Sequence, residues 1–224
     1  MSVPRISLIT PTGVLGMGFL DESLERGISL KPDIIACDAG STDSGPFYLC
    51  SATLKMSRFA ILQDLRRLVL ACNQLKIPLI IGSCGTSGVD SGVDWMREMT
   101  LEIAREEYLS FKLGKVYSEQ NPKLMAEAFQ SGKIEPLPEA PEIDEQIIQN
   151  CSHIVAMMGH EPIVHLLEEK CDVILCGRAS DTALFAALPL MHGFPAGPVW
   201  HCAKTIECEA ICSKPQVQMV FIQR

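Results

Sequence analysis

Short, uninterrupted apolar runs alternate along this chain with longer segments in which apolar residues recur at helical spacing. The runs show no regular polar alternation, which is typical of strands buried on both faces of a parallel sheet. In segment 59–75, apolar residues recur three and four positions apart, as they do on one face of a helix. The pattern predicts an α/β fold: an open, mostly parallel sheet with helices on both faces, in a Rossmann-like, doubly wound arrangement. The expected strands are 5–10, 33–37, 77–81, 111–117, 154–158 and 172–176.

The expected helices occupy the segments between these runs. They are 20–26, 59–75, 93–109, 122–130, 147–151, 161–169 and 184–188. An acidic, proline-rich stretch at 136–145 is typical of an exposed linker. The chain has 224 residues, of which 47% are apolar, and this suffices for one sizeable core. We therefore expect a single α/β domain at 1–212, followed by a divergent or disordered tail at 213–224.

The net charge of the chain argues against two classes of partner. At −8, it disfavours binding to nucleic acid and to an anionic membrane surface. No apolar run is long enough to cross a bilayer, and the first ten residues lack the pattern of a secretory signal peptide. The ten cysteines are then expected to be reduced thiols, as in a cytoplasmic protein.

In open α/β sheets, ligands bind where strands end and helices begin, so polar residues at strand ends are the candidate site. After the run 172–176 come Gly177, which permits a tight turn, and Arg178, whose planar guanidinium suits a carboxylate or a phosphate. Ser180 and Asp181 follow, either as ligand-binding groups or as caps of the next helix. Both interpretations stay open for Ser180. Helix capping does not require an arginine, so Arg178 favours the ligand-binding interpretation.

The expected strand at 77–81 leads into a glycine-rich loop. The backbone amides and hydroxyls of this loop could cradle a phosphate or a carboxylate. The loop lacks the Walker lysine and the G-x-G-x-x-G pattern, so it favours a small anion over a nucleotide; a tight turn is the structural alternative. The candidate binding residues of the loop are Gly82, Ser83, Gly85 and Thr86.

The expected strand at 33–37 continues with two carboxylates, Asp38 and Asp43, beside the hydroxyls of Ser41 and Thr42. Carboxylates in such a position can serve as a general base or bind a metal ion. An Asx or Ser/Thr turn that caps a helix accounts for the same residues without any ligand. The sequence leaves both interpretations open.

Two further groups of residues contain histidine. His160 follows an expected strand, where it could act as an acid or a base, and its alternative is a structural place at the start of a helix. His165 is five residues further on and lies on another helix face, which excludes the zinc-protease pattern. His201, Lys204 and Cys208 would share one stripe of a helix, but without a C-x-x-C pair we expect no metal site.

Five segments carry most of these polar residues. They are DAGSTDSG at 38–45, IIGS at 80–83, YSEQ at 117–120, GRASDT at 177–182 and AKTIEC at 203–208. In this order they resemble the acyclic terpene utilisation (AtuA-like) family, and the resemblance extends from near Arg5 to about Cys212. It implies a cytosolic catabolic enzyme, a lyase or hydratase that acts on a branched carboxylic acid or its CoA thioester.

Members of this family are longer, with a further α/β portion that is absent here, and they often have glycine where Glu209 stands in this chain. The alternatives are therefore a truncated, inactive family member and a non-catalytic subunit that binds a small ligand. Apolar surface left by a missing portion favours a homo-oligomer. The expected partner is a small-molecule carboxylate or a CoA thioester, and the cofactor stays open.

The resemblance and the strand ends together assign roles to the candidate residues. We expect proton transfer from Asp38, Asp43, Glu119 and His160. We expect substrate binding by Ser41, Thr42, Gly82, Ser83, Gly85, Thr86, Arg178, Ser180, Asp181 and Lys204.

Overall fold

Five parallel strands and one antiparallel strand form a single sheet in the computed structural model, which describes residues 5–208 and 221–223. The order across the sheet is β4-β5-β3-β2-β1-β6, and β6 is the antiparallel strand at the edge. The strands are β1 (Leu8–Thr10), β2 (Ile34–Asp38), β3 (Leu79–Gly82), β4 (Leu113–Val116), β5 (Val173–Cys176) and β6 (Phe221–Gln223). Every residue of β2, β3 and β5 is buried, as their continuous apolar sequences predict.

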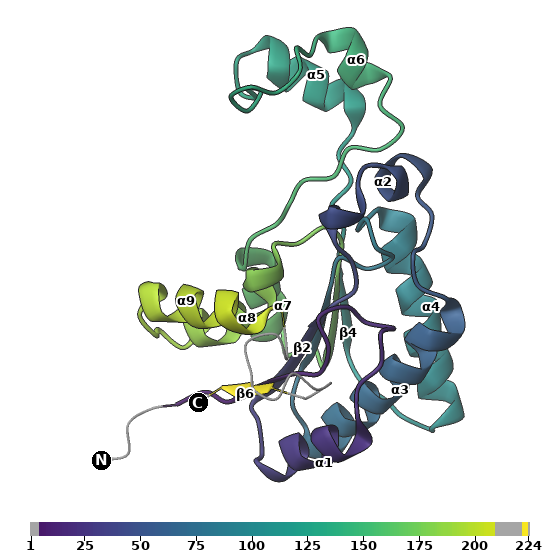
Figure 1. Cartoon of the computed structure of the whole chain (residues 1–224), viewed down its shortest axis with the longest axis vertical. Helices are drawn as coiled ribbons and strands as arrows, with labels where there is room; N and C mark the ends of the chain where they lie inside the picture. The colour runs from purple at the N-terminus through teal and green to yellow at the C-terminus, as the bar shows by residue number, and fades with distance from the viewer. Residues whose placement is uncertain (1–4, 209–220, 224) are drawn as a thin grey trace.

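Helices cover both faces of this sheet (Figure 1). One face packs against α1 (Asp21–Ser29), α3 (Arg58–Leu75) and α4 (Asp90–Glu106). The other packs against α7 (Glu161–Glu168), α8 (Asp181–Met191) and α9 (Ala196–Ile206). The expected α/β class, with a mostly parallel sheet between two helical layers, is confirmed.

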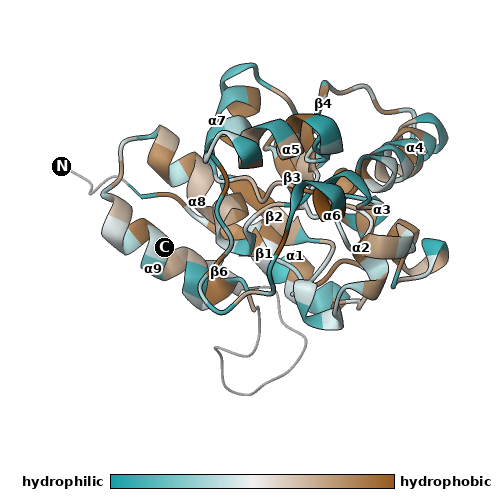
Figure 2. Cartoon of the chain, turned by 90° about the horizontal axis from the view of Figure 1, so that it is seen from above, coloured by the Kyte–Doolittle hydropathy of each residue, from teal (hydrophilic) through white to brown (hydrophobic). Residues whose placement is uncertain are grey.

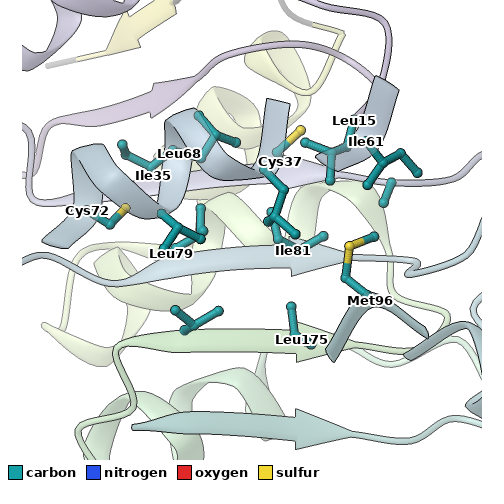
Figure 3. Packing of buried hydrophobic residues seen from close by; sticks show 14 of the residues in the cluster. Leu15, Ile35, Cys37, Ile61, Leu68, Cys72, Leu79, Ile81, Met96 and Leu175 are labelled. Atoms are coloured by element: carbon teal, nitrogen blue, oxygen red, sulfur yellow. The ribbon is translucent and has the colours of Figure 1, made fainter. Parts of the chain in front are cut away.

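Successive strand residues point to opposite faces, so each strand contributes to two separate cores. In β2, Ile35 and Cys37 join the core under α3 and α4, while Ile34 and Ala36 join the core under α7 to α9. Figure 3 shows the first core, in which Cys37 packs among residues from the neighbouring strands and helices. Viewed from above, the strands are mostly apolar, whereas helices such as α3 mix polar and apolar residues (Figure 2).

The connections that leave β3 and β5 run to opposite faces of the sheet. β3 and β5 are adjacent and parallel, with Ile80 paired to Ile174. The chain continues from β3 into α4 on one face and from β5 into α8 on the other. This is a topological switch point, the place where open α/β sheets form a crevice for ligands. The loops after β3 and β5 therefore flank the expected ligand position.

Between β4 and α7 the chain makes an excursion beyond the carboxyl ends of the strands. There α5 (Pro122–Gln130) and α6 (Glu145–Gln149) pack on each other in a projecting lobe (Figure 1). Asn121 caps α5 by accepting hydrogen bonds from the amides of Lys123 and Leu124. The acidic stretch at 136–145 is exposed and largely irregular, and it joins the two helices of the lobe.

Two expectations about single elements need correction. Segment 154–158 is not a strand, since it makes only the isolated bridges Glu119–Val155 and Met158–Ala179. β4 and β5 pair directly along their length. The segment lies beyond their carboxyl ends, where the Ala156 amide donates to the Ser118 carbonyl at 2.8 Å and the Met158 amide donates to the Arg178 carbonyl at 3.0 Å. Within the expected tail, 221–223 form β6, while 213–220 and 224 lie outside the described residues.

Helix boundaries also shift, and one short helix is new. α4 begins at Asp90 rather than at 93. α9 occupies a segment that is not among the expected helix ranges, although the sequence indicated that three residues in and just after it would share one stripe of a helix. A 3₁₀ turn, η1 (Thr42–Ser44), and the short helix α2 (Phe47–Ser51) follow β2. Across 5–208 and 221–223, no helix is both long and apolar enough to cross a membrane.

Candidate functional site

Three loops meet at the carboxyl ends of β2, β3 and β5, and glycines allow their backbones to touch. A Cβ on Gly40 would lie 1.9 Å from the carbonyl oxygen of Thr86, in the loop after β3. A Cβ on Gly88 would lie 2.2 Å from the amide nitrogen of Arg178, in the loop after β5. Any side chain at these positions would force the loops apart, because the obstacle in each case is backbone. The glycines of these segments therefore serve to assemble the site.

An open pocket of about 290 Å³ lies over these loops. It is formed by the loop after β2, the short helix α2, the loop after β3, the segment 154–158 that contains Val155, and the loop after β5. The lining residues are Ser41, Thr42, Gly45, Pro46, Tyr48, Leu49, Ser87, Val155 and Arg178. Three of the expected binding residues, Ser41, Thr42 and Arg178, thus come together in one pocket.

The guanidinium of Arg178 is buried without a counterion. The residue is only 4% exposed, and its Nε and Nη2 atoms have no hydrogen-bond partner. Its backbone is firmly held, since its amide donates to Ser118 Oγ at 2.7 Å and its carbonyl accepts from Met158 at 3.0 Å. Among residues 5–208 no carboxylate forms an ion pair with Arg178. A buried charge is costly unless it is paired, so this arrangement favours an anionic ligand.

Asp38 is the last residue of β2 and is also buried. Its Oδ2 accepts from the Gly40 amide at 3.2 Å, and its Oδ1 has no hydrogen-bond partner. Burial and the negative charge of Asp181 raise the pKa of Asp38 to about 7, against the opposing effects of Arg178, Ser83 and the Gly40 amide. Near neutral pH the carboxyl is therefore present in both protonation states, as a proton-transfer group requires. Asp38 lies at the base of the loop that carries Ser41 and Thr42 and does not itself line the pocket.

Asp181 belongs to a small acidic network at the start of α8. Burial, followed by a hydrogen bond to Glu207 and the charge of Glu207, raises the pKa of Asp181 to about 6. Although burial opposes it, hydrogen bonds from Lys204 and Asp181 lower the pKa of Glu207. Lys204 is exposed and forms an ion pair with Glu207. Lys204 and Asp181 are thus engaged with Glu207, a residue that the sequence analysis did not single out.

Glu119 joins the end of β4 to the start of α4. Its Oε2 accepts from the Asp90 amide at 2.8 Å, and its Oε1 lies 2.6 Å from Nδ1 of His153. In return, Oδ1 of Asp90 accepts from the Glu119 amide at 3.1 Å. Reciprocal bonds of this kind satisfy backbone donors at a helix N-terminus. The arrangement gives Glu119 a capping role, and the sequence contained no signal for its partner His153.

Replacing Glu119 by alanine is expected to lower the free energy of unfolding by about 1–2 kcal/mol, because α4 loses its cap and His153 loses its partner. Urea denaturation measures the change. Glu142→Ala serves as the control, since this glutamate is exposed and irregular and its removal should change stability by less than about 0.5 kcal/mol. Equal effects of the two substitutions would contradict the capping role.

Asp43 and His160 are not brought to the pocket. Asp43 is exposed, and its amide donates to Ser41 Oγ at 3.1 Å, so the Ser/Thr turn considered for this segment is present. His160 is the N-cap residue immediately before α7 and packs edge-on against Trp200, with ring centroids 5.5 Å apart. It lines a different pocket of about 210 Å³, which shares no residue with the one at Arg178.

The glycine-rich loop after β3 uses its amides for contacts between loops. The amides of Ser83 and Cys84 donate to the carbonyls of Gly177 and Cys176, both at 3.0 Å, and Thr86 Oγ1 accepts from the Lys55 amide. These amides are not free to cradle an anion. The loop instead contributes the hydroxyl of Ser87, which is buried, lines the pocket and has no hydrogen-bond partner. Ser87 is not among the binding residues expected from the sequence, although it lies within the same glycine-rich loop.

The remaining glycine and serine residues have structural contacts. Gly82 leaves room for Leu184 of α8, since a Cβ there would lie 2.5 Å from Leu184 Cδ1, and a Cβ on Gly85 would lie 2.5 Å from Gly92. Ser180 stands at the N-terminus of α8, but its hydroxyl contacts Thr182 Oγ1 at 3.0 Å and makes no capping bond. Within the described part of the chain, no group of three or more His, Cys, Asp or Glu side chains could hold a metal ion.

Comparison with known proteins places this architecture in a family. The model of the acyclic terpene utilisation family protein AtuA matches residues 59–197, more than half of the chain. The matched region contains the loops after β3 and β5, and it ends before Lys204 and begins after Asp38. Searches of curated proteins and of solved structures returned no match. The chain belongs to the acyclic terpene utilisation (AtuA) family.

Proposed function

We propose that this chain is a catabolic enzyme of the lyase or hydratase type, which acts on a branched carboxylic acid or its CoA thioester in the pocket at Arg178. Membership of the AtuA family supports a catabolic role. The observation that carries the proposal is that the buried Arg178, which forms no ion pair within 5–208, lies near Asp38, whose pKa is about 7. An anion-binding group thus lies near enough to interact electrostatically with a group able to exchange protons at neutral pH.

The proposed chemistry assigns a role to each group. A lyase or hydratase removes a proton from the carbon beside a carbonyl, or returns one to it, and must stabilise the charge that develops. Asp38 takes or returns this proton, and Arg178 holds the anionic group of the substrate. Ser41 and Thr42 line the same pocket, and their hydroxyls are among the donors available to the developing oxyanion.

A specific observation favours a second candidate, a non-catalytic subunit that binds a small ligand. Asp38 does not line the pocket, and neither do Asp43, Glu119 or His160. On this alternative, Arg178 binds the same class of anion, but no bond is made or broken. Both candidates predict that a small anion binds at Arg178, but only the enzyme predicts that the ligand is converted into a product.

Asp38→Asn tests the catalytic proposal. We expect turnover to fall at least about a hundredfold, because the amide cannot exchange the proton, while substrate binding persists. Turnover of branched acids and their CoA thioesters is followed by mass spectrometry across pH 5–9, where the wild-type rate should change near pH 7 and the residual rate of the variant should not. Asp43→Asn, a change at an exposed carboxylate outside the pocket, is the control and should keep the wild-type rate.

The outcomes separate the candidates. Binding of an acid or thioester without any turnover would favour the binding subunit and overturn the lyase or hydratase proposal. A wild-type rate in Asp38→Asn would remove Asp38 from the mechanism. Binding of ATP or NAD in place of these substrates would favour a nucleotide-binding protein, against which the missing phosphate-loop patterns argue.

A further inference from the structure

One edge of the Arg178 guanidinium is left without partners. Nε and Nη2 both lack hydrogen bonds, and in a guanidinium these two nitrogens carry the parallel N–H groups of a single edge. Two parallel donors at this spacing match the two oxygens of a carboxylate in a bidentate contact. The residue is only 4% exposed and both nitrogens are buried, so solvent does not satisfy these donors.

A third unpartnered group belongs to the same pocket. Ser87 Oγ is buried and has no hydrogen-bond partner, and Ser87 lines the pocket together with Arg178. The two residues are held close because Gly88 touches the backbone of Arg178, whose amide also approaches the Gly88 carbonyl at 3.2 Å. Buried polar groups are rarely left without partners, and here three such atoms belong to two residues that line one pocket.

The positive charge of Arg178 is not neutralised by its neighbours. Asp38 and Asp181 are near enough to interact with this charge, but neither forms an ion pair with it within 5–208. Burial keeps the carboxyl of Asp38 partly protonated at neutral pH, and Asp181 shares its hydrogen bond with Glu207. A ligand with a full negative charge would therefore supply the missing counterion.

The rest of the pocket is largely apolar. Besides Arg178 and Ser87, the lining includes the apolar side chains of Pro46, Leu49 and Val155 and the ring of Tyr48. A volume of about 290 Å³ is at the small end of the range for ligand pockets, and it suits a short aliphatic chain better than a nucleotide. The pocket thus combines one buried charge with a largely apolar lining.

We infer that Arg178 and Ser87 form a subsite for the free carboxylate of a small, branched aliphatic acid. The two carboxylate oxygens bind Nε and Nη2, the Ser87 hydroxyl donates to one of them, and the aliphatic chain contacts Pro46, Tyr48, Leu49 and Val155. This deepens the proposed function, on which it rests for the identity of the pocket. The subsite favours a free carboxylate over a thioester, because a thioester carbonyl offers only one uncharged oxygen to the two N–H donors of Arg178.

Isothermal titration of the full chain tests the inference with four probes: 3-methylbutanoate, 3-methylbutanamide, 3-methylbutanoyl-CoA and inorganic phosphate. We expect the acid to bind and the amide, which has the same shape but no charge, to bind at least about tenfold more weakly. Phosphate and the CoA thioester should not displace the acid. Equal binding of acid and amide, or preferential binding of phosphate or of the thioester, would overturn the inference.

Variants locate the acid within the pocket. Arg178→Gln should weaken acid binding by about a hundredfold, Arg178→Lys by about tenfold because the fork is lost, and Ser87→Ala by about fivefold. Arg58→Gln is the matched control, because Arg58 forms a surface ion pair with Glu102, and it should bind the acid as the wild type does. Unchanged binding in both Arg178 variants would exclude the subsite.

Stability without ligand gives a readout that does not depend on binding. Replacing a structural arginine removes stabilising contacts and lowers stability. Replacing an arginine whose buried charge is unpaired removes the desolvation cost of that charge. The thermal midpoint of Arg178→Gln should therefore equal or exceed that of the wild type, and a clear drop would assign Arg178 to the fold instead. Acid binding without turnover would end the lyase or hydratase proposal and keep this inference. Undiminished turnover of thioesters by the Arg178→Gln variant would keep the lyase or hydratase proposal and overturn this inference.

Discussion

Replacement of Gly40 by alanine is expected to lower the free energy of unfolding by about 3 kcal/mol or more. The new Cβ would lie 1.9 Å from the carbonyl oxygen of Thr86, a distance that no side-chain rearrangement can relieve. The loop after β2 would have to move away from the loop after β3, and the pocket between them would open. The expected loss is a large fraction of the stability of a single domain.

Gly197→Ala is the matched control for this substitution. Gly197 lies in α9 with no atom within 4 Å of its would-be Cβ, so alanine there should be neutral or stabilise by up to about 1 kcal/mol. Denaturant titration of both variants measures the difference, and ligand binding by Gly40→Ala reports on the pocket. A Gly40→Ala variant as stable as the wild type would show that the two loops do not touch as described.

Stability is expected to fall as pH rises from about 4 to about 7, by about 4 kcal/mol from Asp38 alone. The pKa of Asp38 is about 7 in the folded protein, whereas the ordinary value of an aspartate, which applies to the unfolded chain, is 3.8. Between pH 3.8 and about 7 the folded state therefore binds more protons than the unfolded state does. The stability contributed by the protonated carboxyl is therefore complete below about pH 4 and is lost as pH rises through 7. Raised pKa values of Asp181 and Asp64 act in the same direction.

Asp38→Asn should remove most of this pH dependence. The amide cannot ionise, so the variant should be more stable than the wild type at pH 8 and should lose that advantage toward pH 4. Urea midpoints between pH 4 and 8 measure the slope, and Asp43→Asn, at an exposed carboxylate, should retain it. Parallel slopes for wild type and Asp38→Asn would mean that Asp38 is not buried as an acid.

The sheet could be predicted because burial on both faces leaves a clear mark in the sequence. The runs that became β2, β3 and β5 are apolar throughout, and their burial is complete. The same pattern is misleading at 154–158, where an apolar run lies beyond the carboxyl ends of β4 and β5 and stays partly exposed. Strand order decides this outcome, and neither composition nor spacing contains strand order.

The sequence predicts where in the fold the candidate site lies better than it predicts which side-chain atoms are left free to bind a ligand. Arg178, Ser41 and Thr42 were expected from their places at strand ends, where the topology brings them together. Ser87 was missed, since which group of a loop remains unpartnered depends on contacts with other loops. The same holds for Glu207, which meets Asp181 only because α9 packs beside α8.

The position of β5 between β3 and β4 has a consequence for folding. β4 precedes β5 in the chain but pairs only with β5, so it has no partner in the sheet until β5 arrives. Contacts between residues far apart in the sequence form slowly because a long loop must close first. During synthesis, the first three strands can associate early, while the fourth waits. The pocket, which needs loops from both sides of this late insertion, is expected to be among the last parts of the molecule to take shape.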